Sequence, residues 1–138
     1  MSATPFVLDN SVLCGWFLAN QTSPYCDAVA DLLPVVDAHA PSLLQLEFTN
    51  VLRTACRRGT MAVTAAHAIV DQVALLPIRI DATPPQPAAL LSLALRFQLT
   101  SYDAAYLELA LRLQLPIATR DGDLAEAAWA AGVGVLTA

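Results

Sequence analysis

The sequence has 138 residues, enough for one domain with a continuous core, and it is acidic, with 12 Asp and Glu, 7 Lys and Arg, and a net charge of -5. All seven basic residues are arginines, which excludes phosphate-binding loops and Schiff-base catalysis because both need a lysine. The negative balance also excludes a broad basic face for nucleic acid, so such a substrate would have to be held locally by a few arginines and a bound metal ion.

The cysteines and the apolar residues indicate in which cellular compartment the protein is expected. Cys14, Cys26 and Cys56 are odd in number and form no C-x-x-C pair, which indicates a reducing, cytoplasmic environment. The first residues, MSATPFVLD, lack the basic region of a signal peptide. The longest uncharged stretch, residues 10–26, contains Asn, Gln, Thr, Ser and Pro, so we expect no membrane span. We therefore assign the high apolar content to a full core and a subunit interface.

The first half of the chain is predicted to alternate short strands with helices. Residues 5–9 (PFVLD) are typical of a buried strand, Asn10 and Ser11 then begin a helix through Leu18, and another helix starts at Pro24. Residues 35–41 (VVDAHAP) predict a second strand. A long helix over residues 42–58 ends at Gly59. Its predicted buried side consists of Leu43, Leu44, Leu46, Phe48, Val51, Leu52 and Ala55.

The second half continues the alternation. Helices are predicted over residues 64–76, 88–97, 102–113 and 124–130. Short strands are predicted over residues 77–80, 116–119 and 133–136, and the proline-rich residues 81–87 form a loop. Short apolar strands between helices indicate an α/β layered fold with a mostly parallel sheet, and we expect residues 1–138 to form one such domain.

Four acidic residues stand where such a fold places ligand sites. Asp9 ends the first strand, Asp121 follows the strand at residues 116–119, and Asp103 lies at a helix start. Ligands of parallel sheets bind outside the carboxyl ends of the strands, so these acids are predicted to share one rim. Each of the three could instead serve as a helix cap, a role worth about 1 kcal/mol that needs no metal.

Glu47 cannot be explained by capping. It lies in the middle of the helix at residues 42–58, among apolar neighbours. A carboxylate there must reach solvent, pair with a cation or bind metal, because burying it alone costs several kcal/mol. Asn50, three residues on, shares its face and is a possible hydrogen-bond partner. An exposed helix edge and a metal site remain equally open for Glu47.

The motifs around these acids resemble the PIN-domain family, and within it the VapC-type toxins of bacterial toxin-antitoxin pairs. They are VLDNS at 7–11, E-x-x-N-x-L at 47–52, YDAAYLELA at 102–110 and ATRDGDL at 118–124. The resemblance covers essentially the whole chain and implies a three-layer α/β/α domain with a short, mostly parallel central sheet. Asn10 departs from the family pattern, which usually has a small hydroxyl residue or alanine there.

The resemblance also implies a metal-dependent endoribonuclease. In this pattern Mg²⁺ or Mn²⁺ is bound by Asp9, Glu47, Asp103 and Asp121. The polar positions near the ion or the substrate are Ser11, Asn50, Thr119, Arg120 and Asp123. Asp123 is an additional acid two residues beyond Asp121, and the T-x-D pattern favours Asp121 as the ligand. The implied partners are RNA, a VapB-like antitoxin offering an arginine to the carboxylates, and a second copy of the chain in a homodimer, with no membrane.

The chemistry of clustered carboxylates supports this interpretation independently. Crowded carboxylates repel one another, a hard divalent ion relieves the repulsion, and water bound to that ion can attack a phosphodiester. Two alternatives remain. One is a PIN-fold binding or regulatory protein without nuclease activity. The other is a phosphate-transfer enzyme of the receiver or phosphatase kind, which the absence of lysine disfavours.

Overall fold

The computed structural model describes residues 3–138, which form a four-stranded sheet, seven α-helices and one short 3₁₀ helix. The strands are β1 (Phe6–Leu8), β2 (Ala38–Pro41), β3 (Ile78–Asp81) and β4 (Ile117–Ala118). The helices are α1 (Asn10–Phe17), η1 (Ala19–Gln21), α2 (Pro24–Ala30), α3 (Leu43–Arg57), α4 (Val63–Ala74), α5 (Pro87–Phe97), α6 (Ser101–Leu113) and α7 (Gly122–Ala130).

The sheet has the order β3-β2-β1-β4, and all neighbouring strands are parallel. The chain begins in the middle of the sheet with β1, moves outward through β2 to β3, and returns to the other side of β1 with β4. The order therefore reverses between β1 and β4, where Leu8 pairs with Ala118 and the N–H of Asp9 donates to the carbonyl of Ala118 at 3.0 Å. This reversal lies at the carboxyl ends of the two strands, the place where α/β folds bind ligands.

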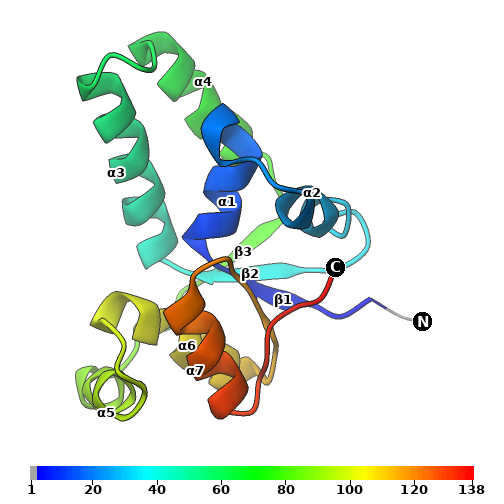
Figure 1. The fold of residues 1–138 in the computed structure, drawn as a ribbon, viewed down its shortest axis with the longest axis vertical. Helices are drawn as coiled ribbons and strands as arrows, with labels where there is room; N and C mark the ends of the chain where they lie inside the picture. Colours follow the sequence, from blue (N-terminus) through cyan, green and yellow to red (C-terminus); the bar gives the residue numbers. More distant parts are fainter. Residues whose placement is uncertain (1–2) are drawn as a thin grey trace.

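Helices cover both faces of the sheet (Figure 1). Helices α1 to α4 lie on one side, where α3 and α4 pack together as a hairpin that projects from the body, and α5 to α7 lie on the other side. The predicted three-layer α/β/α arrangement with a parallel sheet is confirmed. Within residues 3–138, no helix combines the length and apolarity needed to cross a bilayer.

The core joins these layers through the two central strands. Every residue of β1 is fully buried, and so are both residues of β4. Helix α6 supplies the largest buried side chain, Tyr106, and Phe48 of α3 packs edge-on against Phe17 of α1 at 6.1 Å between ring centres. The short strands are thus held mainly by apolar packing on both faces.

Three details of the prediction were wrong. Strand β2 begins at Ala38, not at residue 35, because Val35 and Val36 lie in the turn that precedes it. The last predicted strand, residues 133–136, forms only one isolated bridge between Val135 and Ile117. Leu46, expected on the buried side of α3, is 70% exposed. Val35 and Leu46 are exposed because nothing covers them, whereas Leu136 is buried without forming a regular strand.

Gly15 in α1 is predicted to be intolerant of a side chain. A Cβ there would lie 2.4 Å from Cys26 Sγ and 3.1 Å from Arg120 Nη2. We expect Gly15→Ala to lower the free energy of unfolding by about 1 to 3 kcal/mol, the usual cost of overpacking. Gly122→Ala is the matched control, since nothing lies within 4 Å of its Cβ position. Chemical denaturation measures both, and equal stability of the two variants would contradict this account.

Candidate active site

Asp9 is the most buried of the four acids, with 5% of its surface exposed. It caps α1, accepting a hydrogen bond from the backbone N–H of Ser11. Its Oδ2 also accepts from the Ser11 hydroxyl at 2.7 Å and from the Thr119 hydroxyl at 2.8 Å. Burial raises the pKa of Asp9, and these hydrogen bonds oppose the rise. Asp9 thus caps α1 and is also held in place at the carboxyl ends of β1 and β4.

The two hydroxyls connect Asp9 to the loop after β4. The Ser11 hydroxyl accepts from the backbone N–H of Arg120 at 3.0 Å, and the Thr119 hydroxyl accepts from the N–H of Asp121 at 3.0 Å. Each hydroxyl therefore receives one hydrogen bond from the loop and donates one to the same carboxylate. Two segments more than a hundred residues apart are fixed against each other by this arrangement.

Arg120 joins three segments of the chain through hydrogen bonds. Its guanidinium donates to the backbone carbonyl of Gln21 at 2.7 Å and to the carbonyl of Ser11. The side chain therefore fastens the loop after β4 to both α1 and η1. The sequence suggested a contact with substrate for this residue, but it did not indicate these intramolecular bonds, which depend on packing against Gly15.

Asp103 has a strongly raised pKa. It lies in the first turn of α6, whose N-cap is Thr100, so it does not cap the helix itself. Its pKa is raised to about 7, first by desolvation and then by the negative charges of Asp121, Asp9 and Glu47. The other three predicted acids therefore lie within electrostatic reach of Asp103.

Asp121 and Asp123 differ in their surroundings. Asp121 is half-buried, caps α7 through the N–H of Leu124 at 3.3 Å, and is the strongest charge acting on Asp103. Asp123 lies exposed in the first turn of α7. The difference favours Asp121 as the member of the acidic group, as the T-x-D spacing suggested.

Glu47 is half-buried on α3 and accepts a 2.6 Å hydrogen bond from the hydroxyl of Tyr106. The expectation of a hydrogen bond from Asn50 was wrong: Asn50 is exposed and lines a neighbouring cavity. Desolvation raises the pKa of Glu47, the Tyr106 bond opposes this, and the charge of Asp9 adds to the rise. Sequence reasoning missed Tyr106, although a tyrosine on the apolar side of α6 was the available signal.

The acids suit a divalent metal ion in donor chemistry. They supply only carboxylate oxygens, which Mg²⁺ and Mn²⁺ prefer, and their charges add to the rise in the pKa of Asp103 that burial causes. Within residues 3–138, no three acidic, histidine or cysteine side chains stand close enough to enclose an ion as they are placed. Asp9 and Asp121 also cap the N-termini of α1 and α7.

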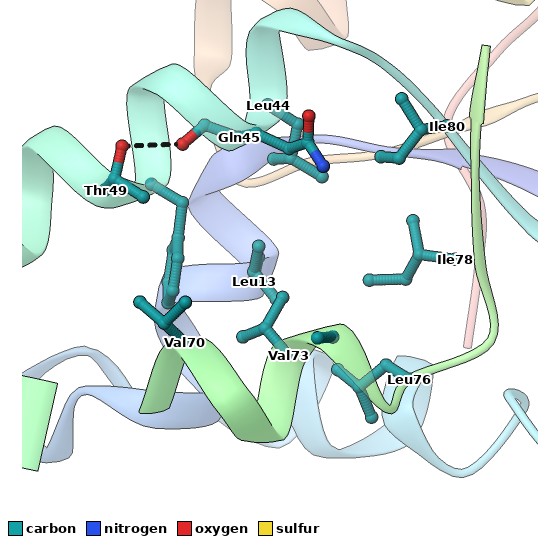
Figure 2. A pocket seen from close by; sticks show the side chains of 11 residues that line it. Leu13, Leu44, Gln45, Thr49, Val70, Val73, Leu76, Ile78 and Ile80 are labelled. Atoms are coloured by element: carbon teal, nitrogen blue, oxygen red, sulfur yellow. Dashed lines mark hydrogen bonds between the residues drawn. The ribbon is translucent and has the colours of Figure 1, made fainter. Parts of the chain in front are cut away.

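Two cavities are lined in part by α3, the helix that carries Glu47, and neither is lined by one of the four acids. The first, of about 410 Å³, lies between α3, α4 and β3 and is mostly apolar. In Figure 2, Val73, Leu76 and Ile78 point into it, while Gln45 and Thr49 lie along α3. The second, of about 680 Å³, lies between the end of α1, η1 and α3, and its lining includes Gln21, Asn50 and Arg58.

Comparisons with known proteins identify the family of this fold. A model of the PIN domain matches residues 6–130, from the start of β1 to the end of α7. The chain belongs to the PIN domain family. Proteins named Ribonuclease VapC1, from two strains of Mycobacterium tuberculosis, are 36% identical to it over 92 residues, which are 65% of this chain and 67% of theirs. The predicted VapC type within the PIN family is thereby confirmed.

A solved structure extends the comparison to the fold of this PIN domain. The crystal structure of PAE2754 from Pyrobaculum aerophilum superposes with a TM-score of 0.64, covering 90% of this chain and 84% of that one. The two sequences are 18% identical, so this likeness shows the fold alone.

Proposed function

We propose that this PIN domain is a metal-dependent endoribonuclease, the toxin of a toxin-antitoxin pair. The observation that carries the proposal is the raised pKa of Asp103, about 7, to which burial contributes most and the negative charges of Asp121, Asp9 and Glu47 add. Such a group favours a divalent cation over protons near neutral pH. The 36% identity to proteins named ribonucleases supports RNA as the substrate.

In this proposal Asp9, Glu47, Asp103 and Asp121 hold Mg²⁺ or Mn²⁺. When bound, the ion supplies an activated water and stabilises the leaving oxygen of a phosphodiester. The Ser11 and Thr119 hydroxyls fix Asp9 from one side, and Tyr106 holds Glu47. The buried position of Asp9 limits the water around its carboxylate.

The second cavity is the part of the surface that best supports RNA binding. It adjoins the acidic group through α3, since Asn50 lies one turn from Glu47, and Arg58 lines its far end. Arg53 and Arg57 are exposed on the same helix. A few arginines beside an acidic centre hold phosphates locally, as an acidic chain requires.

The proposed protein partner is a VapB-like antitoxin. The acidic rim is suited to an arginine from such a segment. The apolar cavity in Figure 2 supports the proposal further, because its residues Leu44 and Phe48 lie on α3, the helix that carries Glu47. A peptide packed there by apolar side chains would lie along the helix that presents one of the acids.

Self-association into a homodimer is the remaining partner proposal. Leu91 and Leu95 lie one turn apart on α5 and are 61% and 72% exposed, which supports an apolar contact surface on that helix. Light scattering should give twice the mass of one chain. The free cysteines Cys14, Cys26 and Cys56 support a cytoplasmic setting for the complex.

Cleavage of a mixed RNA pool tests the proposed activity. Protein purified without antitoxin should cut RNA with Mn²⁺ or Mg²⁺, and EDTA or Asp9→Asn should abolish the cut. Asparagine keeps the helix cap at this position, so the variant should remain folded. No cleavage of tRNA, rRNA or mRNA by folded wild-type protein would contradict the nuclease and favour the binding or regulatory alternative.

A further inference from the structure

Tyr106 is the largest fully buried side chain of the chain's described part, with 0% of its surface exposed. A buried phenol needs a hydrogen-bond partner, because an unpaired hydroxyl in the core costs about 1 to 3 kcal/mol. Its hydroxyl donates to Glu47 Oε1 at 2.6 Å. Its partner is therefore a member of the acidic group and not a backbone group of the core.

The bond joins two helices at the site. Tyr106 lies on α6, one turn after Asp103, and Glu47 lies on α3. Helix α6 thus presents one acid itself and holds a second acid that comes from another helix. Glu47 otherwise sits on a half-buried stretch where Leu44 and Phe48 pack into the core. A short bond from a hydroxyl to a carboxylate is among the stronger hydrogen bonds in proteins.

Other uses of Tyr106 do not fit its position. Full burial prevents its ring from stacking on a base, a role that exposed Tyr102 on the same helix could fill. Packing alone would be satisfied by phenylalanine and does not require a bond to Glu47, the one acid of the group that lies in the middle of a helix. The position of the hydroxyl is explained by its acceptor.

We propose that Tyr106 is a positioning residue that fixes the Glu47 carboxylate as a metal ligand. The bond occupies Oε1, removes rotational freedom of the glutamate, and leaves its second oxygen for the ion. This inference rests on the proposed function, since it assigns a role within the same metal site. Groups that orient metal ligands typically contribute 10- to 100-fold in affinity or activity.

Tyr106→Phe tests the inference with Tyr102→Phe as the matched control. Tyr102 lies one turn away on α6 and is 60% exposed, so its variant makes the same chemical change without losing a bond to Glu47. The affinity for Mn²⁺, measured from the metal-induced rise in melting temperature, should be roughly 10- to 100-fold weaker in Tyr106→Phe than in wild type. The rate constant for RNA cleavage should fall comparably, with little change in KM. Tyr102→Phe should bind Mn²⁺ like wild type.

A double-mutant cycle with Glu47→Gln separates positioning from a general structural effect. If Tyr106 acts through Glu47, Tyr106→Phe should cause no further loss of Mn²⁺ affinity in the Glu47→Gln background. An equal loss in both backgrounds, or wild-type Mn²⁺ affinity in Tyr106→Phe, would overturn the inference while leaving the nuclease proposal intact. A wild-type protein that responds to no divalent metal would overturn both.

Discussion

Asp103→Asn is expected to stabilise the metal-free protein at pH 8 and to abolish its RNA cleavage. The pKa of Asp103 is about 7 in the folded chain, against an ordinary value of 3.8. Between these values the folded state keeps a proton that the unfolded state has released. The contribution of Asp103 to stability is therefore largest below pH 4 and is lost as the pH rises through about 7. Asparagine stays neutral and avoids this loss.

The measurement is thermal denaturation in EDTA between pH 5 and pH 8. The melting temperature of wild type relative to Asp103→Asn should decline as the pH rises, and at pH 8 the variant should be the more stable. The Asp123→Asn variant, which removes one exposed charge at the start of α7, is the control. Cleavage by Asp103→Asn should fall roughly 100-fold or more, beyond the 10- to 100-fold typical of groups that only orient a ligand. A variant less stable than wild type at pH 8 would contradict the argument.

The second large effect is expected from a pair of acids two residues apart. Asp121→Asn should reduce metal-dependent cleavage roughly 100-fold or more, because the charge of Asp121 raises the pKa of Asp103 more than any other charge does. Asp123→Asn should leave cleavage nearly unchanged, since Asp123 is exposed in the first turn of α7. Asparagine is as good an N-cap as aspartate, so α7 should begin normally in the Asp121 variant.

Single-turnover cleavage in Mn²⁺, with melting temperatures of both variants, decides between the two acids. Comparable activity of the two variants would show that the acids share the role, and loss only in Asp123→Asn would reverse the assignment. The comparison is sharp because both changes remove one negative charge at the start of the same helix. A purely long-range effect of charge would reduce both activities alike.

Much of the fold was readable from local sequence signals. Helix α1 begins where the strand residues give way to Asn10 and Ser11, and α3 ends before Gly59, whose backbone φ is +74°. Asp9, Asp103 and Asp121 drew attention because strand ends and helix starts share one rim of a parallel sheet, and the four-acid site with Glu47 stays a prediction. The structure could be predicted from local sequence wherever a residue interacts with the backbone of its own segment, as a helix cap does.

Features that depend on distant partners could not be predicted. Val35 and Val36 have strand-forming side chains, but no neighbouring strand pairs with them, so they lie in a turn. The bond of Glu47 to Tyr106 spans 59 residues, and the bonds of Arg120 to Ser11 and Gln21 span 109 and 99 residues. Sequence spacing on one helix suggested Asn50 for Glu47, but packing between α3 and α6 brought Tyr106 to it instead.

The central proposal is that Asp9, Glu47, Asp103 and Asp121 together form one site that binds a divalent metal ion. Its most direct test is the anomalous diffraction of Mn²⁺ in crystals of the wild-type protein, grown or soaked with the ion. The account predicts Mn²⁺ on the rim between β1 and β4, with carboxylate oxygens of these acids as its protein ligands. A fully occupied Mn²⁺ at another place, or bound without Asp9 and Asp103, would contradict it.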